Sequence, residues 1–136
     1  MKKSVLTLIF GFLFAVSSAF AVPATNGDGW TYEDELDLIG TLSKGKGPRT
    51  LFKQIQGTKY TEGLKFTFTV FNAEPFDVAL TIKNEATGVV CHYETFGLMS
   101  STAPKYIETT SFAPGTYSIT FTDTGGGIMT GSFTIE

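Results

Sequence analysis

The chain has 136 residues, with ten basic residues against 13 acidic ones and a net charge of −3 at neutral pH. This length suffices for one domain with a single core, and the acidic balance argues against nucleic acid and anionic membrane surfaces as partners. The single cysteine, Cys91, excludes an internal disulfide.

The first 21 residues have the organisation of a signal peptide. Two lysines after Met1 precede an apolar run over residues 5–16, and Ala19-Phe20-Ala21 matches an A-x-A cleavage site. The run of 12 residues is much shorter than the ~20 that a membrane-spanning helix needs. We therefore expect cleavage after Ala21, no membrane span in the remaining chain, and a location in the periplasm or outside the cell.

Residues 22–35 have the composition of a flexible acidic leader. Proline, glycine and asparagine occur in it without hydrophobic periodicity, and its acidic end from Trp30 to Asp37 is also compatible with a helical turn. The spacing of its oxygen-bearing side chains matches no complete calcium-binding loop. These side chains are Asn26, Asp28, Glu33, Asp34, Glu35 and Asp37.

Residues 36–136 alternate between apolar and polar positions, as half-buried antiparallel strands do. The clearest strand runs from Leu64 to Phe71, with Leu64, Phe66, Phe68 and Val70 on one face. Further strands are predicted at 78–82, 89–95, 117–122 and 128–135, and weaker ones around 36–42, 50–56 and 105–110, with turns at 84–88 and 123–127. Short strands with turn signals at near-regular spacing indicate a sandwich or a barrel.

The segment Ala113-Pro114-Gly115-Thr116-Tyr117 favours the sandwich, because it places a turn just before a strong strand that starts with tyrosine. In immunoglobulin-like sandwiches, a tyrosine at such a corner hydrogen-bonds to the backbone a few residues upstream. A core tyrosine without this bond is the alternative. We predict an all-β, immunoglobulin-like antiparallel β-sandwich of seven to eight short strands.

The chain also resembles a domain-of-unknown-function family of short exported proteins from Gram-negative gut anaerobes. The matching segments are Ile39-Gly40, Arg49-Thr50, Gly88-Val89-Val90, Pro114-Gly115-Thr116-Tyr117 and Gly131-Ser132-Phe133-Thr134-Ile135. The resemblance covers residues 36–136 and implies an immunoglobulin-like sandwich. It implies no activity and no site residues.

No set of residues has the pattern of a catalytic or metal centre. His92 is the only histidine, and Cys91 beside it points to the opposite face of a strand, so the two cannot form a nucleophile–base pair. One histidine and one cysteine do not make a zinc site. We expect no enzymatic activity, no metal and no cofactor, with a small hydrolase as the remote alternative. Cys91 itself is expected to be a buried thiol, with an intermolecular bridge or a reactive thiol as the alternative.

Two apolar groups outside the predicted core are candidates for a partner surface. Trp30 and Tyr32 lie in the polar leader, and Phe96 and Met99 lie in the connection before Lys105. Exposed aromatic residues and methionine are enriched at interfaces. The alternative, which loops with satellite clusters often show, is that both pairs pack over the open ends of the sandwich. The basic segment 44–49 is expected to be a solvated connection.

The function most consistent with these observations is a secreted, non-enzymatic module that binds a protein or glycan through loops or an edge strand. The alternative is a structural cell-envelope subunit that assembles by strand pairing. Weak self-association is compatible with either.

Overall fold

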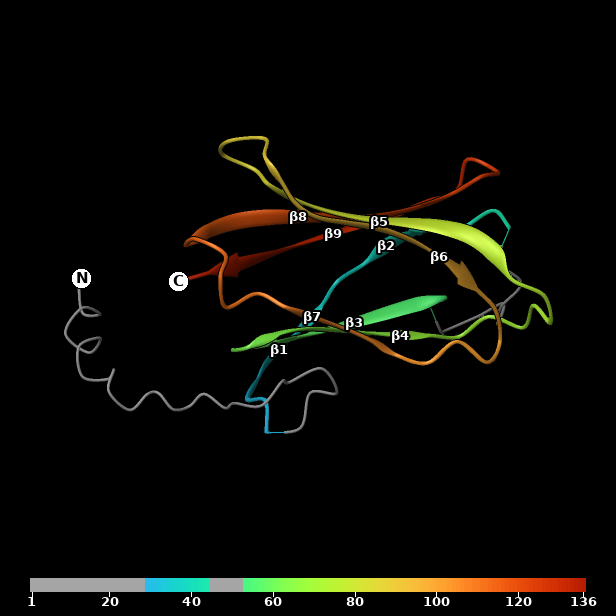
Figure 1. Ribbon diagram of the computed structural model, residues 1–136, viewed down its shortest axis with the longest axis horizontal. Coiled ribbons are helices and arrows are strands. Elements are labelled where there is room, and N and C mark those ends of the chain that lie inside the picture. Colours follow the sequence, from blue (N-terminus) through green and yellow to red (C-terminus); the bar gives the residue numbers. More distant parts are fainter. Residues whose placement is uncertain (1–28, 45–52) are drawn as a thin grey trace.

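The structure is a computed structural model, and it describes residues 29–44 and 53–136. In these ranges the chain forms nine strands and no helix. The strands are β1 (Tyr32–Leu36), β2 (Ile39–Thr41), β3 (Ile55–Tyr60), β4 (Gly63–Phe68), β5 (Phe76–Asn84), β6 (Val90–Leu98), β7 (Lys105–Glu108), β8 (Gly115–Asp123) and β9 (Ile128–Ile135). They form two antiparallel sheets packed face to face (Figure 1), which confirms the predicted sandwich with one strand more than expected.

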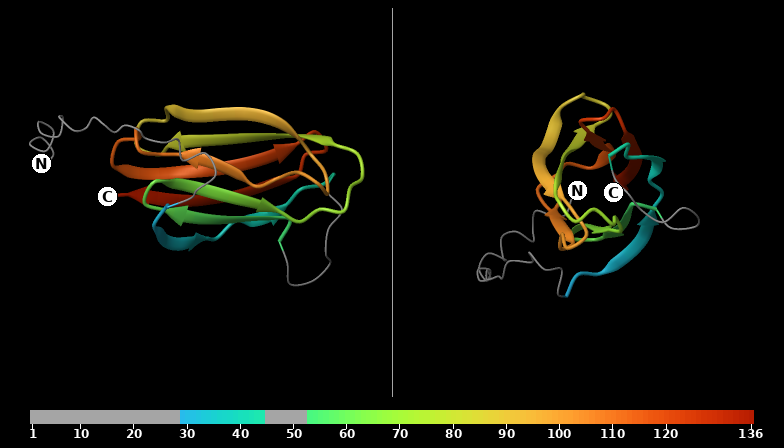
Figure 2. Two further views of the ribbon diagram at one scale, coloured as in Figure 1. Left: turned by 60° about the horizontal axis from the view of Figure 1, so that its bottom comes forward. Right: turned by 90° about the vertical axis from the view of Figure 1, so that its right-hand side faces the viewer.

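The order of strands determines which of them lie at the edges. The four-stranded sheet has the order β1-β3-β4-β7, and the five-stranded sheet has the order β2-β9-β8-β5-β6. Seen along the strands, β1 and β2 lie at one lateral side of the sandwich and β6 and β7 at the other (Figure 2). The two lateral sides are therefore the places where the core comes closest to solvent.

The core lies between the two sheets and is almost entirely aliphatic and aromatic. Phe66 of β4 and Phe121 of β8 are fully buried, and their rings meet edge to face with centroids 5.0 Å apart. Apolar burial of this kind is the main force that holds the two sheets together. The other buried apolar residues are Leu38, Leu42, Ile55, Leu64, Val70, Val78, Leu80, Ile82, Leu98, Ile107, Tyr117, Ile119, Met129 and Phe133.

The strand faces predicted from alternation are confirmed. In β4, Leu64 and Phe66 are buried, whereas Lys65 is half-buried and Thr67 is exposed. β5, β8 and β9 repeat the pattern with their predicted inward residues. Phe68 faces inward but is only partly buried, because it lies at the end of β4 against Phe96 rather than between the sheets' centres.

The predicted corner is confirmed by its hydrogen bond. The hydroxyl of Tyr117 donates to the backbone carbonyl oxygen of Ala113 at 2.5 Å. The ring of Tyr117 stacks on Phe133 and lies against Phe112, with centroids 5.3 Å away in both cases. The tyrosine therefore connects the loop before β8 to the core.

The two predicted hairpin turns are also present. Asn84 closes the β5–β6 turn by accepting the backbone N–H groups of Ala86 and Thr87 with its side-chain oxygen. In the β8–β9 turn, the buried carboxylate of Asp123 accepts hydrogen bonds from Gly125 and Gly127. It accepts two more from outside the turn, from the hydroxyl of Ser43 at 2.9 Å and the N–H of Lys44 at 2.6 Å.

Asp123 thereby ties the end of β2 to the β8–β9 turn. Burial raises the pKa of its carboxyl, but the hydrogen bonds that it accepts outweigh burial and lower the pKa below the ordinary value. An ionised carboxylate at this position is part of the fold.

The boundary predicted at residue 36 is wrong, because the sandwich begins earlier. Tyr32–Leu36, expected in the leader, form strand β1 and pair with β3. The prediction failed because an edge strand with four exposed residues in a row shows no alternation. The weaker strands are confirmed with changed bounds: β2 and β3 differ by several residues from the expected 36–42 and 50–56, and β7 begins at the expected residue 105 but ends two residues before 110.

Two expectations about β6 are also wrong. Cys91 is exposed rather than buried, because it shares the outward face of β6 with the exposed Tyr93, Thr95 and Gly97. It is also an extra, bulged residue, since the β5–β6 ladder pairs Ile82 with His92 but Lys83 with Val90. Phe96 and Leu98, expected in a connection, belong to the strand itself. The proposed signal peptide, residues 22–28 and most of the basic segment 44–49 lie outside the described residues.

Candidate functional site

A row of four aromatic rings crosses the outer face of the four-stranded sheet. Tyr32 of β1 lies directly opposite Tyr60 of β3, with centroids 6.3 Å apart. Trp30 lies edge to face with Tyr60 at 5.8 Å and with Tyr106 of β7 at 5.7 Å. The aromatic row, Tyr32-Tyr60-Trp30-Tyr106, thus follows the strand order β1-β3-β4-β7.

The register of the strands explains why these rings face outward. Lys59 and Leu64 are inward-facing and buried, so their neighbours Tyr60 and Gly63 point to the outer face. Tyr106 lies opposite the outward-facing Lys65. Alternation alone therefore places two of the tyrosines on one surface.

Trp30 occupies the position over β4 where the strand has no side chain. A Cβ atom at Gly63 would lie 2.7 Å from Cη2 of Trp30, so only glycine leaves room for the indole. The indole Nε1 is covered and has no hydrogen-bond acceptor among the described residues. Trp30 is consequently fixed against the sheet, which aligns Tyr60 and Tyr106 on either side of it.

The aromatic row is accessible and has hydrogen-bonding groups beside it. Tyr32 is 57% exposed, and Trp30, Tyr60 and Tyr106 are half-buried. The ammonium group of Lys65 lies 5.7 Å from the centroid of the Tyr106 ring. Desolvation, together with the carboxylates of Glu35 and Asp34, raises the pKa of Tyr32 above its ordinary value, so its hydroxyl stays protonated at neutral pH.

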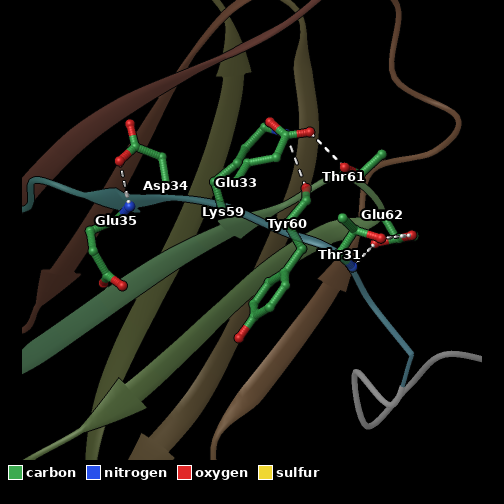
Figure 3. Close-up of polar contacts among 8 residues, drawn as sticks. All are labelled: Thr31, Glu33, Asp34, Glu35, Lys59, Tyr60, Thr61 and Glu62. Atoms are coloured by element: carbon green, nitrogen blue, oxygen red, sulfur yellow. Dashed lines mark hydrogen bonds and ion pairs between the residues drawn. The ribbon is translucent and has the colours of Figure 1, made fainter.

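The chain that leads into the aromatic row is held by the carboxylate of Glu62 (Figure 3). Glu62, in the β3–β4 turn, accepts the backbone N–H of Thr31 at 2.7 Å and also its hydroxyl. Thr31 in turn accepts the N–H of Thr61 with its carbonyl oxygen. These contacts fix the backbone between Trp30 and Tyr32, and with it the spacing of their rings.

An acidic cleft of about 300 Å³ lies beside β1, between this strand and β9. Glu33 is the bulged residue of β1, since Tyr32 pairs with Tyr60 and Asp34 with the adjacent Lys59. The bulge directs Glu33 toward Lys59 and Thr61 (Figure 3), at 2.9 and 2.8 Å. These two hydrogen bonds hold the pKa of Glu33 below its ordinary value.

Lys59 is the buried partner of this ion pair. Its side chain is 8% exposed, against 42% for Glu33, and its ammonium group also donates to the carbonyl oxygen of Tyr60. The pair closes the lateral side of the sandwich with matched charges. The cleft is also lined by the carboxylates of Asp34 and Glu35 and by the hydroxyl groups of Ser132 and Thr134, and its described lining includes no histidine or cysteine.

The structure brings together one of the two predicted pairs and places the other elsewhere. Trp30 and Tyr32 belong to the aromatic row. Phe96 faces the core side of β6, where it lies against Phe68 and under the ammonium group of Lys105 at 4.6 Å. Met99 is half-buried just after β6, with its N–H bound to the hydroxyl of Thr102.

Tyr60 and Tyr106 were not identified from the sequence. Both occupy outward positions of strands that the pattern placed with shifted bounds, and the row forms only when β1, β3 and β7 lie side by side. Their outward position could have been inferred from local alternation. Tyr60 alternates with the buried Gly57 and Lys59 positions, and Tyr106 precedes the buried Ile107.

The histidine belongs to a hydrogen-bonded network with Glu94 and Lys105. His92 shares a 2.8 Å contact with Glu94, which also binds Lys105 of β7 at 2.7 Å. Burial raises the pKa of Glu94, but the hydrogen bonds from Lys105 and His92 outweigh it and lower the pKa. The network bridges the two sheets at the β6–β7 side, and Cys91 lies on a separate bulge with its thiol toward the carbonyl of Val89.

Within residues 29–44 and 53–136, no group of three or more His, Cys, Asp or Glu side chains is arranged to hold a metal ion. The same ranges contain no helix with the length and hydropathy needed to cross a membrane.

Comparison with known proteins supports the fold. No family model and no curated protein matches the chain. A solved structure that is similar is a DUF3244 family protein with an immunoglobulin-like β-sandwich fold from Bacteroides vulgatus. The two share 21% identity at a TM-score of 0.61, over 76% of this chain and 98% of that one. This confirms the immunoglobulin-like class, and the neighbour belongs to the kind of family that the sequence resembles.

Proposed function

We propose that this protein is an exported, non-enzymatic binding module that holds a glycan chain against the aromatic row. The observation that supports the proposal is the row itself. Four aromatic rings cross the outer face of a rigid sheet, and the centroids of neighbouring rings lie 5.7–6.3 Å apart. A sheet that carries its contact residues on its own strands loses little conformational freedom on binding.

The chemistry of the row matches a carbohydrate better than a protein partner. A sugar ring has an apolar C–H face and a rim of hydroxyl groups, so it packs on an aromatic ring while it hydrogen-bonds at the side. Tyrosine and tryptophan combine a large apolar surface with a polar group. The residues next to the rings on this face are polar, including Thr58, Lys65 and the exposed Gln56 and Thr67.

The polar groups beside the rings supply both donors and acceptors. Lys65 donates next to Tyr106, and Glu35, whose carboxylate accepts from the hydroxyl of Thr58, offers an acceptor next to Tyr32. Neutral sugars need both kinds of group, because each hydroxyl is a donor and an acceptor. A row with both at its flanks suits a neutral polysaccharide.

The test is affinity electrophoresis of the purified protein through gels that contain neutral polysaccharides, namely glucans, xylans and mannans in turn. We expect retardation by at least one of them, and Tyr32→Ala and Tyr60→Ala should each weaken binding about tenfold or more while the melting temperature changes little. Tyr93→Ala is the matched control, since Tyr93 is 62% exposed on the other sheet.

Lack of retardation by every polysaccharide, or equal losses in the tyrosine variants and the control, would count against the glycan proposal. Retention of a cell-envelope protein by the wild type but not by Tyr32→Ala would point instead to a protein partner on the same surface.

Export is the second part of the proposal, and it is supported by the organisation of residues 1–21. Fractionation of producing cells, followed by N-terminal sequencing, should recover a chain that begins at Val22 outside the cytoplasm. A chain that keeps Met1, or one found in the cytoplasm, would contradict it.

A further inference from the structure

Strand β6 differs from the other edge strands in being long and without outward charge. Among the strands that the structure describes, β1, β7, β2 and β6 lie at sheet edges. β2 has three residues and β7 has four, while β1 has a bulge and three consecutive acidic residues. β6 has nine residues, and short length, charge and bulges are the usual means by which proteins keep edges from pairing.

The regular part of β6 is the seven residues from His92 to Leu98, which pair with β5 without interruption. Its outward face consists of Tyr93, Thr95 and Gly97, all exposed. Its polar side chains His92 and Glu94 face the core side, where Glu94 already contacts both His92 and Lys105. The backbone N–H and C=O groups on the side away from β5 therefore lie at an edge with no outward charge to repel another strand.

We propose that β6 pairs in antiparallel fashion with β6 of a second copy of this chain, about a two-fold axis at Thr95. Thr95 is the middle of the seven regular residues, so an axis there lets all seven pair with the second copy and leaves the bulge at Cys91 outside the pairing. The two five-stranded sheets become one continuous sheet across the dimer. This interface goes beyond the proposed glycan binding, because the aromatic row lies on the other sheet.

The outward side chains of β6 are complementary to themselves in this register. Thr95 lies opposite Thr95 of the second copy, a cross-strand pair that stabilises sheets. Tyr93 lies opposite Gly97 of the second copy, where Pro75 packs over the glycine. The space over Gly97 is thus already filled, and the ring of Tyr93 packs against Pro75 of the second copy.

The inward side chains add charge complementarity, which favours a second copy over an unrelated peptide. Glu94 lies opposite Phe96 of the second copy. The ammonium group of Lys105 lies over the ring of this Phe96, 4.6 Å from its centroid. Each Glu94 thereby comes close to Lys105 of the other chain, which also keeps its 2.7 Å contact with Glu94 of its own chain, and the two-fold axis makes this arrangement twice. No like charges are placed directly opposite each other.

Sedimentation velocity at rising concentration of the purified protein tests the proposal. We expect a dimer whose population grows with concentration. Thr95→Lys places two ammonium groups opposite each other at the axis and should weaken dimerisation about tenfold or more. Thr67→Lys, at an exposed threonine on the outer face of the other sheet, should leave dimerisation unchanged. Circular dichroism should show both variants folded.

A cross-link provides the independent readout. Thr95→Cys in a Cys91→Ser background places one thiol per chain at the axis, so a short bis-maleimide should join two chains, while Thr67→Cys in the same background should remain monomeric. The proposal is overturned if the wild type sediments as a monomer up to about 1 mM. It is also overturned if the Thr95 variants dimerise and cross-link no differently from their Thr67 controls.

Discussion

The hydroxyl of Tyr117 and the backbone carbonyl oxygen of Ala113 lie 2.5 Å apart, and this hydrogen bond connects the loop before β8 to the centre of the core. Tyr117 is 1% exposed, so its hydroxyl has been removed from water and depends on this acceptor. The bond has consequences that can be measured.

Replacement of Tyr117 by phenylalanine should lower the free energy of unfolding by about 1–2 kcal/mol, because the ring stays in place while a buried hydrogen bond is lost. Urea unfolding followed by fluorescence measures the difference. Tyr93→Phe, at an exposed ring, should change the value by less than about 0.5 kcal/mol. If the two variants were equally stable, the corner would contribute nothing beyond packing.

The core prediction separates two phenylalanines of β4 that the sequence pattern treats alike. Phe66 is fully buried against Phe121, so Phe66→Ala should cost about 3–5 kcal/mol. Phe68 is only partly buried, and Phe68→Ala should cost clearly less. Thermal or urea unfolding ranks the variants, with the outward-facing Thr67→Ala as the control. An equal loss at Phe66 and Thr67 would mean that the strand faces are reversed.

Acid sensitivity should depend on Asp123. Its pKa is lowered in the folded protein, so the ionised form stabilises the fold above the unfolded pKa of about 3.9, and this contribution is lost as the pH falls through the lower, folded pKa. Asp123→Asn should lower the free energy of unfolding by about 1–3 kcal/mol at neutral pH, because the neutral amide has one oxygen in place of the carboxylate that accepts four hydrogen bonds.

The same variant should also lose stability less steeply than the wild type below about pH 4. Urea midpoints measured from neutral pH to acid pH compare the two slopes. Parallel curves would show that Asp123 does not titrate between the folded and unfolded states. Glu33 and Glu94 also have lowered pKa values, so part of the acid sensitivity should remain in the variant.

The Glu33–Lys59 pair should respond differently to the loss of each partner. Glu33→Gln leaves the ammonium group of Lys59, 8% exposed, without its counter-ion and should cost about 1–2 kcal/mol. Lys59→Met buries an apolar chain of similar length and leaves Glu33, 42% exposed, in contact with water, so it should be close to wild type. Urea midpoints at neutral pH test the order, and a larger loss for Lys59→Met would reverse our account.

Much of the fold could be predicted from the sequence because its physical causes are local. A strand with one buried face must alternate, and β4, β5, β8 and β9 have one buried face along their whole length. Turn chemistry is equally local, as the side chain of Asn84 shows by closing its own turn. The corner tyrosine followed from its position between a turn and a strand.

The edge strands and the candidate site were decided by tertiary structure. β1 has solvent on most of its surface, so nothing in its sequence distinguishes it from an acidic leader until β3 pairs with it. Cys91 alternates with its neighbours as any strand residue does, but the packing of the sheets decides which face of β6 is buried, and Cys91 lies on the outward face with Tyr93. The aromatic row joins residues from β1, β3 and β7 and from the segment before β1. Their proximity depends on the order of strands in the sheet, which long-range packing determines and local pattern does not.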